Sequence, residues 1–373
     1  MSGPLQDLRV VEMPAIGPAP FCGMLLADLG ADVLRLDRTG DTNLGISIDA
    51  RFDLLGRGKR SLAVDLKAPS SSALVLAILE KADVVIEGFR PGTMEKLGLG
   101  PEVVLAVNPR LIYGRMTGWG QSGPLARTAG HDINYLSLTG ALHAIGQRDQ
   151  APIPPLNLVA DFGGGALYLA MGILAALFER QRSGRGQVID AAMVDGASSL
   201  MTMTYGLLAA GAWRDERGVN LLDGGAPWYG TYQCADGKYV AIGALEAKFF
   251  ARLLQCIGID PARFPDHLNR TCWPDIRQAL TETLLTRTRD EWCAAVGDRD
   301  CCVAPVLALS EAPHHPHMTA RQTLAEHDGV TQPAPAPRFS RTPGAIRRGP
   351  PACGEGGEEA LREWGVDSRV EPK

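Results

Sequence analysis

Short apolar runs alternate with amphipathic segments through the first third of the chain. The apolar runs predict buried strands at 8–13, 31–37, 61–66, 82–87 and 111–116. Between them, apolar residues at helical spacing predict helices over about 21–29 and 70–81, and Gly30 ends the first of these. Strands that alternate with helices are typical of a parallel sheet covered by helices. The pattern therefore predicts an α/β fold with a doubly wound sheet.

The longest apolar run covers residues 162–178 and is rich in glycine and alanine. It is slightly shorter than a bilayer span, so we expect a buried core helix over about 161–182 rather than a membrane segment. The basic residues and glycines of 180–186 are a usual helix end. A short strand at 187–190 and a second apolar helix over about 192–211 are predicted after it.

The pattern changes after residue 228. The segments 229–234 and 238–243 predict two strands joined by a tight turn. Helical spacing follows at about 247–257 and 273–285. These elements predict a smaller α+β domain that ends between residues 310 and 325. Two domains also fit the length of 373 residues, which is too long for one ordinary core.

Composition narrows the class of function. Hydrophobic residues make up 45% and charged residues 21% of the chain, which is ordinary for a globular protein. The formal net charge of -5 argues against a nucleic-acid-binding protein and against a basic membrane surface. The eight cysteines show no CxxC spacing and indicate free thiols in a reducing compartment. Residues 1–8 lack the features of a signal peptide, so we expect a cytoplasmic location and no membrane partner.

Three cations follow predicted strands: Arg38, Lys67 and Arg90. In sheets of this type, ligands bind beyond the carboxyl ends of the strands. Any one of these side chains has an ordinary alternative role as a solvated surface residue. Three of them at equivalent strand ends predict a pocket for an anionic ligand.

The strand–helix–strand opening also suggests a dinucleotide site. However, the loop at 16–23 holds Pro18 and Pro20 where a dinucleotide fingerprint needs glycines. Prolines remove the amide donors that would hold a pyrophosphate. We therefore expect no nicotinamide cofactor.

A histidine and an aspartate are candidates for proton transfer. His131 follows a glycine in a predicted polar break, and imidazole is matched to proton transfer near neutral pH. Asp161 begins the apolar helix, and the glycines 163–165 would let a ligand approach the helix start closely. Amides and the positive dipole end there would stabilise an enolate oxygen. The plain alternatives are a solvated histidine and a helix N-cap, and spacing alone does not place the two side chains together.

Further polar residues compete for a role. Glu246 follows a predicted strand of the small domain, where it would orient a histidine or simply start a surface helix. Asp195 is a competing carboxylate that we place after Asp161 and Glu246 as a candidate. The run 314–317 holds three histidines and a proline, with no cysteine at ligand spacing, so we expect a solvated loop and no metal.

The chain resembles the class III CoA-transferase superfamily over nearly its whole length. The motifs that carry the resemblance lie at 8–12, 27–33, 64–67, 82–92, 118–124 and 363–365. Transferases and racemases of the superfamily share these motifs. The stretch Gly130-His131-Asp132-Ile133-Asn134-Tyr135 is similar to the α-methylacyl-CoA racemase branch, since the transferases generally lack this histidine.

The resemblance implies a role for each matching residue. His131 and Asp161 correspond to the two catalytic bases of the racemases, and Glu246 to the carboxylate that partners the histidine. In transferases the comparable aspartate carries the acyl group as an anhydride. The resemblance also implies contacts to CoA or substrate from Arg38, Lys67, Arg90, Gly130, Asn134 and Tyr135.

An architecture is implied as well. A large Rossmann-like CoA-binding domain over 1–200 is completed by 325–373, a linker helix and loop cover 201–228, and a small α+β domain covers 229–324. Two such chains interlock as a homodimer with shared active sites, and the sequence leaves open whether Glu246 partners the His131 of its own subunit or that of the other subunit.

The implied function is a racemase that interconverts (2R)- and (2S)-2-methylacyl-CoA by removing and returning the α-proton, with no metal and no organic cofactor. The first alternative is a class III CoA-transferase with Asp161 as nucleophile. The second is a non-catalytic protein that binds acyl-CoA. The sequence leaves the acyl chain open among branched fatty acids, sterol side chains and small 2-arylpropionates.

Overall fold

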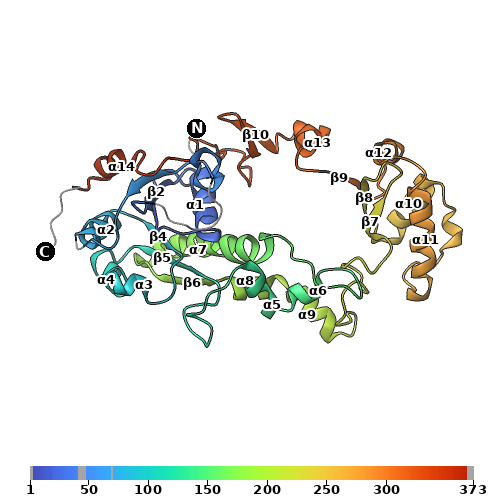
Figure 1. Cartoon of the computed structure of the whole chain (residues 1–373), viewed down its shortest axis with the longest axis horizontal. Coiled ribbons are helices and arrows are strands. Elements are labelled where there is room, and N and C mark those ends of the chain that lie inside the picture. The colour runs from blue at the N-terminus through green and yellow to red at the C-terminus, as the bar shows by residue number, and fades with distance from the viewer. Residues whose placement is uncertain (1–2, 41–47, 69, 368–373) are drawn as a thin grey trace. The chain divides into compact units, whose positions relative to one another are not determined.

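The chain forms two compact units in a computed structural model, which describes residues 3–40, 48–68 and 70–367 (Figure 1). The large unit comprises 1–139, 156–200 and 316–373, and the small unit comprises 140–155 and 201–315. These boundaries differ from the expected ones. Residues 140–155 and the expected linker 201–228 both belong to the small unit, and the chain returns to the large unit at residue 316.

A parallel sheet of six strands forms the centre of the large unit, in the order β3-β2-β1-β4-β5-β6. The strands are β1 (Arg9–Glu12), β2 (Asp32–Asp37), β3 (Arg60–Ala63), β4 (Val84–Glu87), β5 (Ile112–Thr117) and β6 (Val188–Ala192). The order reverses between β1 and β4, and sheets of this kind bind ligands at that switch point. The predicted α/β fold with a parallel sheet is confirmed.

Burial on both faces explains why the central strands are almost continuously apolar. Val10 and Val11 of β1 and Val85 of β4 are all fully buried. One face packs against α2 (Ser71–Glu80), α4 (Pro101–Val107) and α14 (Gly357–Trp364), which share an apolar cluster with Val11 and Val85.

Helix α7 (Leu167–Ser183) packs close to β5 at Gly114. A Cβ on Gly114 would lie 2.9 Å from a methyl carbon of Leu169, so glycine permits this close approach. Further helical segments of the large unit are α1 (Pro18–Asp28), η1 (Ala50–Phe52), η2 (Leu54–Gly56), α3 (Thr93–Lys96), α5 (Asp132–Leu138), α8 (Met193–Leu200) and α13 (Pro316–Ala320).

The helix that contains Asp161 is longer than expected. It begins as a nine-residue π-helix, η3 (Leu158–Ala166), and continues without a break as α7. Asp161 therefore lies in the first turn instead of at the N-cap, which is Asn157. π-Helical segments are rare, and they occur frequently at functional sites.

One side of α7 is exposed. Leu169, Ile173 and Ala176 are buried, but Leu167, Met171, Leu174 and Phe178 are 50%, 60%, 40% and 64% exposed. We call these four residues the apolar stripe. By length and composition alone, the helix 158–183 is apolar enough to cross a membrane, and only 33% of its most apolar window is buried. The prediction of a buried core helix is therefore wrong for this side.

The C-terminal segment completes the large unit. Arg57 is almost fully buried, forms an ion pair with Asp28 at 2.6 Å and donates to Gln332 Oε1 at 2.8 Å. Trp364 Nε1 donates to Asp32 Oδ2 at 2.7 Å, close to the start of β2. The antiparallel strands β10 (Leu324–His327) and β11 (Val330–Pro333) form a hairpin within this segment.

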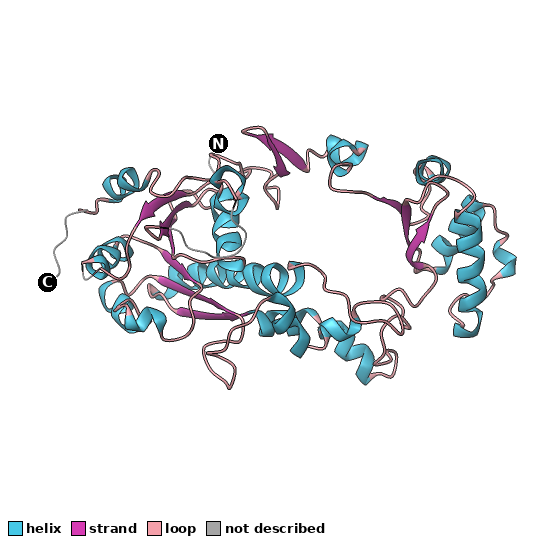
Figure 2. Cartoon of the chain, viewed as in Figure 1, coloured by secondary structure: helices cyan, strands magenta, loops and turns pink. Residues whose placement is uncertain are grey.

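The small unit is an antiparallel sheet packed with helices. Its strands, drawn in magenta like all strands in Figure 2, are β7 (Tyr229–Gln233), β8 (Tyr239–Gly243) and β9 (Val303–Val306). They pair in the order β7-β8-β9. Its helical segments are α6 (Ala141–Ala144), α9 (Thr202–Ala209), α10 (Ala247–Ile257), η4 (Pro261–Arg263), η5 (Arg270–Cys272), α11 (Trp273–Leu284), α12 (Arg289–Val296) and η6 (Ala312–His314). Trp228, Phe250 and Leu280 lie in its apolar core.

Two expected elements differ from the structure. The second apolar helix, expected over 192–211, is two helices, α8 and α9, with Met201 between them. A uniformly apolar run has no periodicity that reveals such a break. The polar break expected around His131 is the N-terminus of helix α5.

Candidate active site

Asp161 lies at the switch point of the sheet. Gly17 follows β1 and is the N-cap of α1, with a φ of 69° that suits glycine. A Cβ on Gly17 would lie only 3.2 Å from Asp161 Oδ2. The side chains of Phe21 and Phe162 pack with ring centroids 4.5 Å apart and join α1 to η3. The first turn of α1 thus holds the carboxylate at the carboxyl end of β1.

Asp132 anchors the helix start that carries Asp161. Its Oδ2 accepts hydrogen bonds from the backbone N–H groups of Ala160 at 2.9 Å and Asp161 at 2.8 Å. These amides are among the donors that the start of a helix leaves without a partner in the helix. Asp132 is only 6% exposed, so the two bonds are shielded from water. Because Asp132 follows His131 directly in the chain, these two hydrogen bonds also fix the position of the His131 backbone.

His131 occupies the N-cap of α5 in extended conformation. Its backbone N–H donates to Asn134 Oδ1 at 3.1 Å, and its carbonyl accepts from the Asn134 N–H at 2.8 Å. The side chain of His131 is exposed. Asn134 therefore fixes the backbone of His131 and leaves the imidazole accessible.

Tyr135 packs against the backbone of the loop that leads to His131. It is 7% exposed, and its hydroxyl donates to the carbonyl of Gly130. A Cβ on Gly118 would lie 1.9 Å from its ring, and a Cβ on Gly130 would lie 2.7 Å from it. The Trp119 ring packs edge-on against it at 4.8 Å. The two glycines are needed because the Tyr135 ring passes directly beneath the backbone.

The environment of Asp161 raises its pKa above the usual range for aspartate. Burial is the largest cause, and the negative charge of Asp132 acts in the same direction. A hydrogen bond from Asn157 Nδ2 to Asp161 Oδ2 at 3.3 Å and the charge of His131 lower this pKa in part. A carboxyl group with a raised pKa holds its proton closer to neutral pH, as a general acid requires.

The structure brings the chain segments that carry His131 and Asp161 together. The two elements that carry them are joined by Asp132, and the charge of His131 acts on Asp161. An imidazole and a carboxyl group on joined elements offer two groups for proton transfer, one to remove a proton and the other to deliver one.

Two interpretations of this helix start need correction. The amides of Ala160 and Asp161 already bind Asp132, so these donors are not free for an enolate oxygen. Gly164 and Gly165 serve helix packing instead of ligand approach. A Cβ on Gly164 would lie 2.5 Å from the Ala197 backbone N in α8, and one on Gly165 would lie 2.8 Å from Met193.

The three predicted anion-binding cations each follow a strand of the parallel sheet. Arg38 follows β2 directly, Arg90 follows β4 by three residues, and Lys67 lies four residues beyond β3. All three side chains are exposed. Arg90 is close enough to Tyr135 that its charge lowers the pKa of that phenol, although burial and Asp161 keep the net shift upward. All three cations thus follow the carboxyl ends of the strands, the side of the sheet on which Asp161 also lies.

Two other carboxylates were candidates. Glu246 is the exposed N-cap of α10 in the small unit, and its side chain makes no capping hydrogen bond to that helix. Its role toward a histidine stays a prediction. Asp195 is exposed on α8. Among the residues that the structure describes, no three histidine, cysteine or acidic side chains are grouped to hold a metal ion.

Sequence reasoning missed two residues of this site. The sequence shows Asp132 only as a neighbour of His131, and Gly17 only as one residue of the proline-containing loop at 16–23. A glycine followed by a proline at a helix start is a local signal that was available for Gly17. No local signal was available for Asp132, because its partners lie 28 and 29 residues away.

Comparisons with known proteins extend this result. A family model described as CoA-transferase family III matches residues 5–356. Proteins named α-methylacyl-CoA racemase from Mus musculus and Homo sapiens are 46% and 44% identical to this chain, and both alignments cover 97% of it and 93% of the relative. A CaiB/BaiF family protein from Brucella suis has a solved structure with a TM-score of 0.84 and 29% identity, covering 98% of this chain and 100% of that one. These matches confirm the resemblance and the prediction of an enzyme.

Proposed function

The chain belongs to CoA-transferase family III, and from this premise we propose that it is a racemase of 2-methylacyl-CoA thioesters. The observation that carries the proposal is the hydrogen bond from the Asp161 N–H to Asp132, the residue after His131, which joins the segments of the two proposed bases. The similarity to two proteins named α-methylacyl-CoA racemase supports the same substrate class.

The proposed mechanism uses the two side chains as complementary bases. For one epimer, neutral His131 removes the α-proton and protonated Asp161 delivers a proton to the opposite face of the enolate. For the other epimer, ionised Asp161 removes the proton and protonated His131 delivers one. The raised pKa of Asp161 supports this exchange of roles, because it brings the affinity of the carboxyl for a proton closer to that of an imidazole. No metal or organic cofactor takes part in the proposed steps.

Recognition of CoA is assigned to the basic edge of the sheet. Arg38, Lys67 and Arg90 are exposed there and suit the phosphates of CoA. Gly130, Asn134 and Tyr135 are proposed to contact the substrate through the loop that carries His131. The hydroxyl of Tyr135 already donates to Gly130, so the contact proposed for Tyr135 is through its ring.

We also propose that two copies associate, because the apolar stripe needs a cover. Its four residues lie on one side of α7 at spacings of three and four, the pattern of a helix that packs against an apolar partner. A homodimer with shared active sites also gives the exposed Glu246 a histidine to partner. This dimer is the proposed state of the enzyme.

Proton exchange in D2O tests the activity. The full chain is incubated with a (2R)- or a (2S)-2-methylacyl-CoA, without any acceptor acid, and the α-proton signal is followed by NMR. The proposal expects loss of the signal and formation of the opposite epimer from both starting materials. His131→Gln and Asp161→Asn should each slow interconversion by about 100-fold or more. No exchange from either epimer would rule out a racemase.

The transferase alternative is distinguished in the same assay. It uses Asp161 as a nucleophile, and family membership supports it as a second candidate. It predicts no exchange without an acceptor acid, transfer of CoA to an added carboxylate, and an acyl-enzyme that hydroxylamine traps at Asp161. Binding of acyl-CoA with neither outcome would indicate a non-catalytic binding protein.

A further inference from the structure

Two cysteines of the small unit approach each other closely. Cys256 lies near the end of α10 and Cys301 lies just before β9, 45 residues further along the chain. Their Sγ atoms are 2.8 Å apart. Carbon atoms in van der Waals contact rest about 3.5–4.0 Å apart, so the two sulfur atoms are closer than such a contact. Among the cysteines that the structure describes, no other pair makes a hydrogen bond between sulfur atoms.

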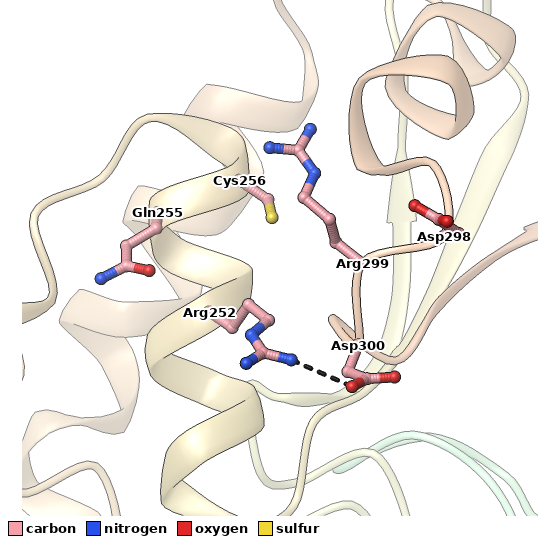
Figure 3. Close-up of a pocket in the computed structure, with 6 residues that line it drawn as sticks. All are labelled: Arg252, Gln255, Cys256, Asp298, Arg299 and Asp300. Carbon is pink, nitrogen blue, oxygen red and sulfur yellow. Dashed lines mark hydrogen bonds and ion pairs between the residues drawn. The ribbon is translucent and has the colours of Figure 1, made fainter.

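The pair lies beside a cavity that opens to solvent. The cavity has a volume of about 370 Å³ and is lined by Arg252, Gln255, Cys256, Asp298, Arg299 and Asp300. Figure 3 shows the Cys256 sulfur on the cavity side of α10, with Arg252 and Arg299 on either side of it. Arg252 forms an ion pair with Asp300 at 3.0 Å and so links α10 to the loop that precedes Cys301.

The two thiols differ in accessibility. Cys256 is partly exposed to the cavity, whereas Cys301 is fully buried. Burial and the hydrogen bond with Cys256 raise the pKa of Cys301 to about 12. Cys301 is therefore a poor first nucleophile, and a reagent from solvent reaches Cys256 first. The arrangement is that of an attacking thiol with a second thiol held next to it.

We propose that Cys256 and Cys301 form a thiol-exchange site that takes low-molecular-weight disulfides and closes into an intramolecular disulfide. In the first step, the thiolate of Cys256 attacks one sulfur of the small disulfide and releases one small thiol. In the second step, Cys301 loses its proton and attacks the Cys256 sulfur of the mixed disulfide, releasing the second small thiol. The protein gives up two electrons and two protons, and the small disulfide takes them to become two thiols.

The cross-link has a structural consequence for the small unit. It would join α10 to the segment that leads into β9 and close a long loop of chain between residues 256 and 301. A disulfide that closes a long loop stabilises mainly by restricting the unfolded chain. Oxidation is therefore expected to raise the melting temperature of the full chain by several degrees, and reduction should reverse the shift.

Glutathione disulfide is the probe for this site. The fully reduced chain is treated with it, excess reagent is removed, and the product is analysed by intact mass, thiol titration and peptide mapping. The expected product contains a 256–301 cross-linked peptide, and neither Cys256 nor Cys301 remains a free thiol or carries glutathione, whatever adducts form at the exposed Cys302 and Cys353. Dithiothreitol should restore all eight thiols.

Single variants separate the two steps. Cys301→Ala should stop the reaction at a stable glutathione adduct on Cys256, and Cys256→Ser should leave Cys301 unmodified because it is buried. Cys302→Ser is the matched control, since Cys302 is exposed and adjacent, and it should cross-link as the parent does. The proposal is overturned if the parent keeps a glutathione adduct at Cys256 or forms its cross-link at another cysteine. The peptide map of the parent decides this even if the Cys301 variant fails to fold.

Discussion

Asp132 Oδ2 accepts a hydrogen bond from the backbone N–H of Asp161 at 2.8 Å, and this contact joins the two elements of the candidate site. On one side, Asp132 is the first residue of α5 and follows His131. On the other, it holds the start of the π-helix that presents Asp161. One buried carboxylate therefore sets the relative position of the two proposed bases without being one of them.

Asp132→Ala is expected to lower kcat by about 100-fold, because a displacement of about 1 Å between catalytic groups has effects of this size. Asp132→Asn keeps one carbonyl oxygen as an acceptor and should retain more activity. The measurement is the rate of epimer interconversion, with circular dichroism to show that each variant is folded. Glu102→Ala, at an exposed position on α4, is the control. Equal activity of Asp132→Ala and the parent would contradict the positioning role.

Asp161 is expected to reduce stability at neutral pH. Burial raises its pKa in the folded protein above the unfolded value of about 3.9, so the folded state binds this proton more tightly. Its contribution is favourable below pH ~3.9 and is lost as the pH rises through the folded pKa. Asp161→Asn should therefore melt at a higher temperature than the parent at pH 7, and the difference should shrink toward pH 4.

The test is to measure the melting temperatures of the parent and of Asp161→Asn between pH 4 and pH 7. Asp195→Asn replaces an exposed carboxylate on α8 and should melt with the parent at every pH. If Asp161→Asn were less stable than the parent at pH 7, the carboxylate would be stabilising and the argument from burial would fail.

A buried ion pair joins Glu12, the last residue of β1, to Lys59, the residue before β3. Both side chains are fully buried, their charged atoms are 2.6 Å apart, and Lys59 Nζ also donates to the Pro20 carbonyl at 2.8 Å. Lys59→Met leaves the Glu12 carboxylate buried without a partner, which costs about 3–5 kcal/mol in comparable cases. Urea denaturation should show a correspondingly lower midpoint.

A double variant tests the cause of that loss. Glu12→Gln combined with Lys59→Met removes both charges and should recover part of the stability lost in Lys59→Met alone. If the double variant is as unstable as Lys59→Met, the loss comes from packing and from the missing bond to Pro20 instead of from the unpaired charge.

The apolar stripe predicts self-association. Phe178 is the most exposed residue of the stripe, at 64%, and Phe178→Asp places a charge at its C-terminal end. Light scattering after gel filtration should give twice the chain mass for the parent and the chain mass for the variant. Val103→Asp makes the matching apolar-to-charged change at an exposed position on a different helix, α4, and should leave the mass unchanged. A parent that runs as a monomer would exclude the dimer.

Several elements could be predicted because their signals are local. The apolar runs around Val10, Val33 and Val84 each predict a buried strand, since a parallel strand is covered on both faces. The hairpin of β7 and β8 follows from two alternating segments with a tight turn between them. His131 and Asp161 were identified as candidates by their chemistry and by the motifs around them.

Other features depended on contacts that no local pattern contains. The apolar runs after residue 160 could not show that α7 leaves one side uncovered, or that the run at 192–211 breaks at Met201. The three glycines at 163–165 looked suited to a ligand, but the approach of α8 decides the role of two of them.

The sequence by itself determined the alternation of strands and helices, the composition of the core and the residue types available for proton transfer, because each depends on neighbours in the chain. The tertiary structure decided which of these residues work together. Asp132 reaches Asp161 across 29 residues, and Gly17 meets the same carboxylate from a loop after β1. Such contacts form when the chain closes its core, and their partners are set by the order of the strands in the sheet.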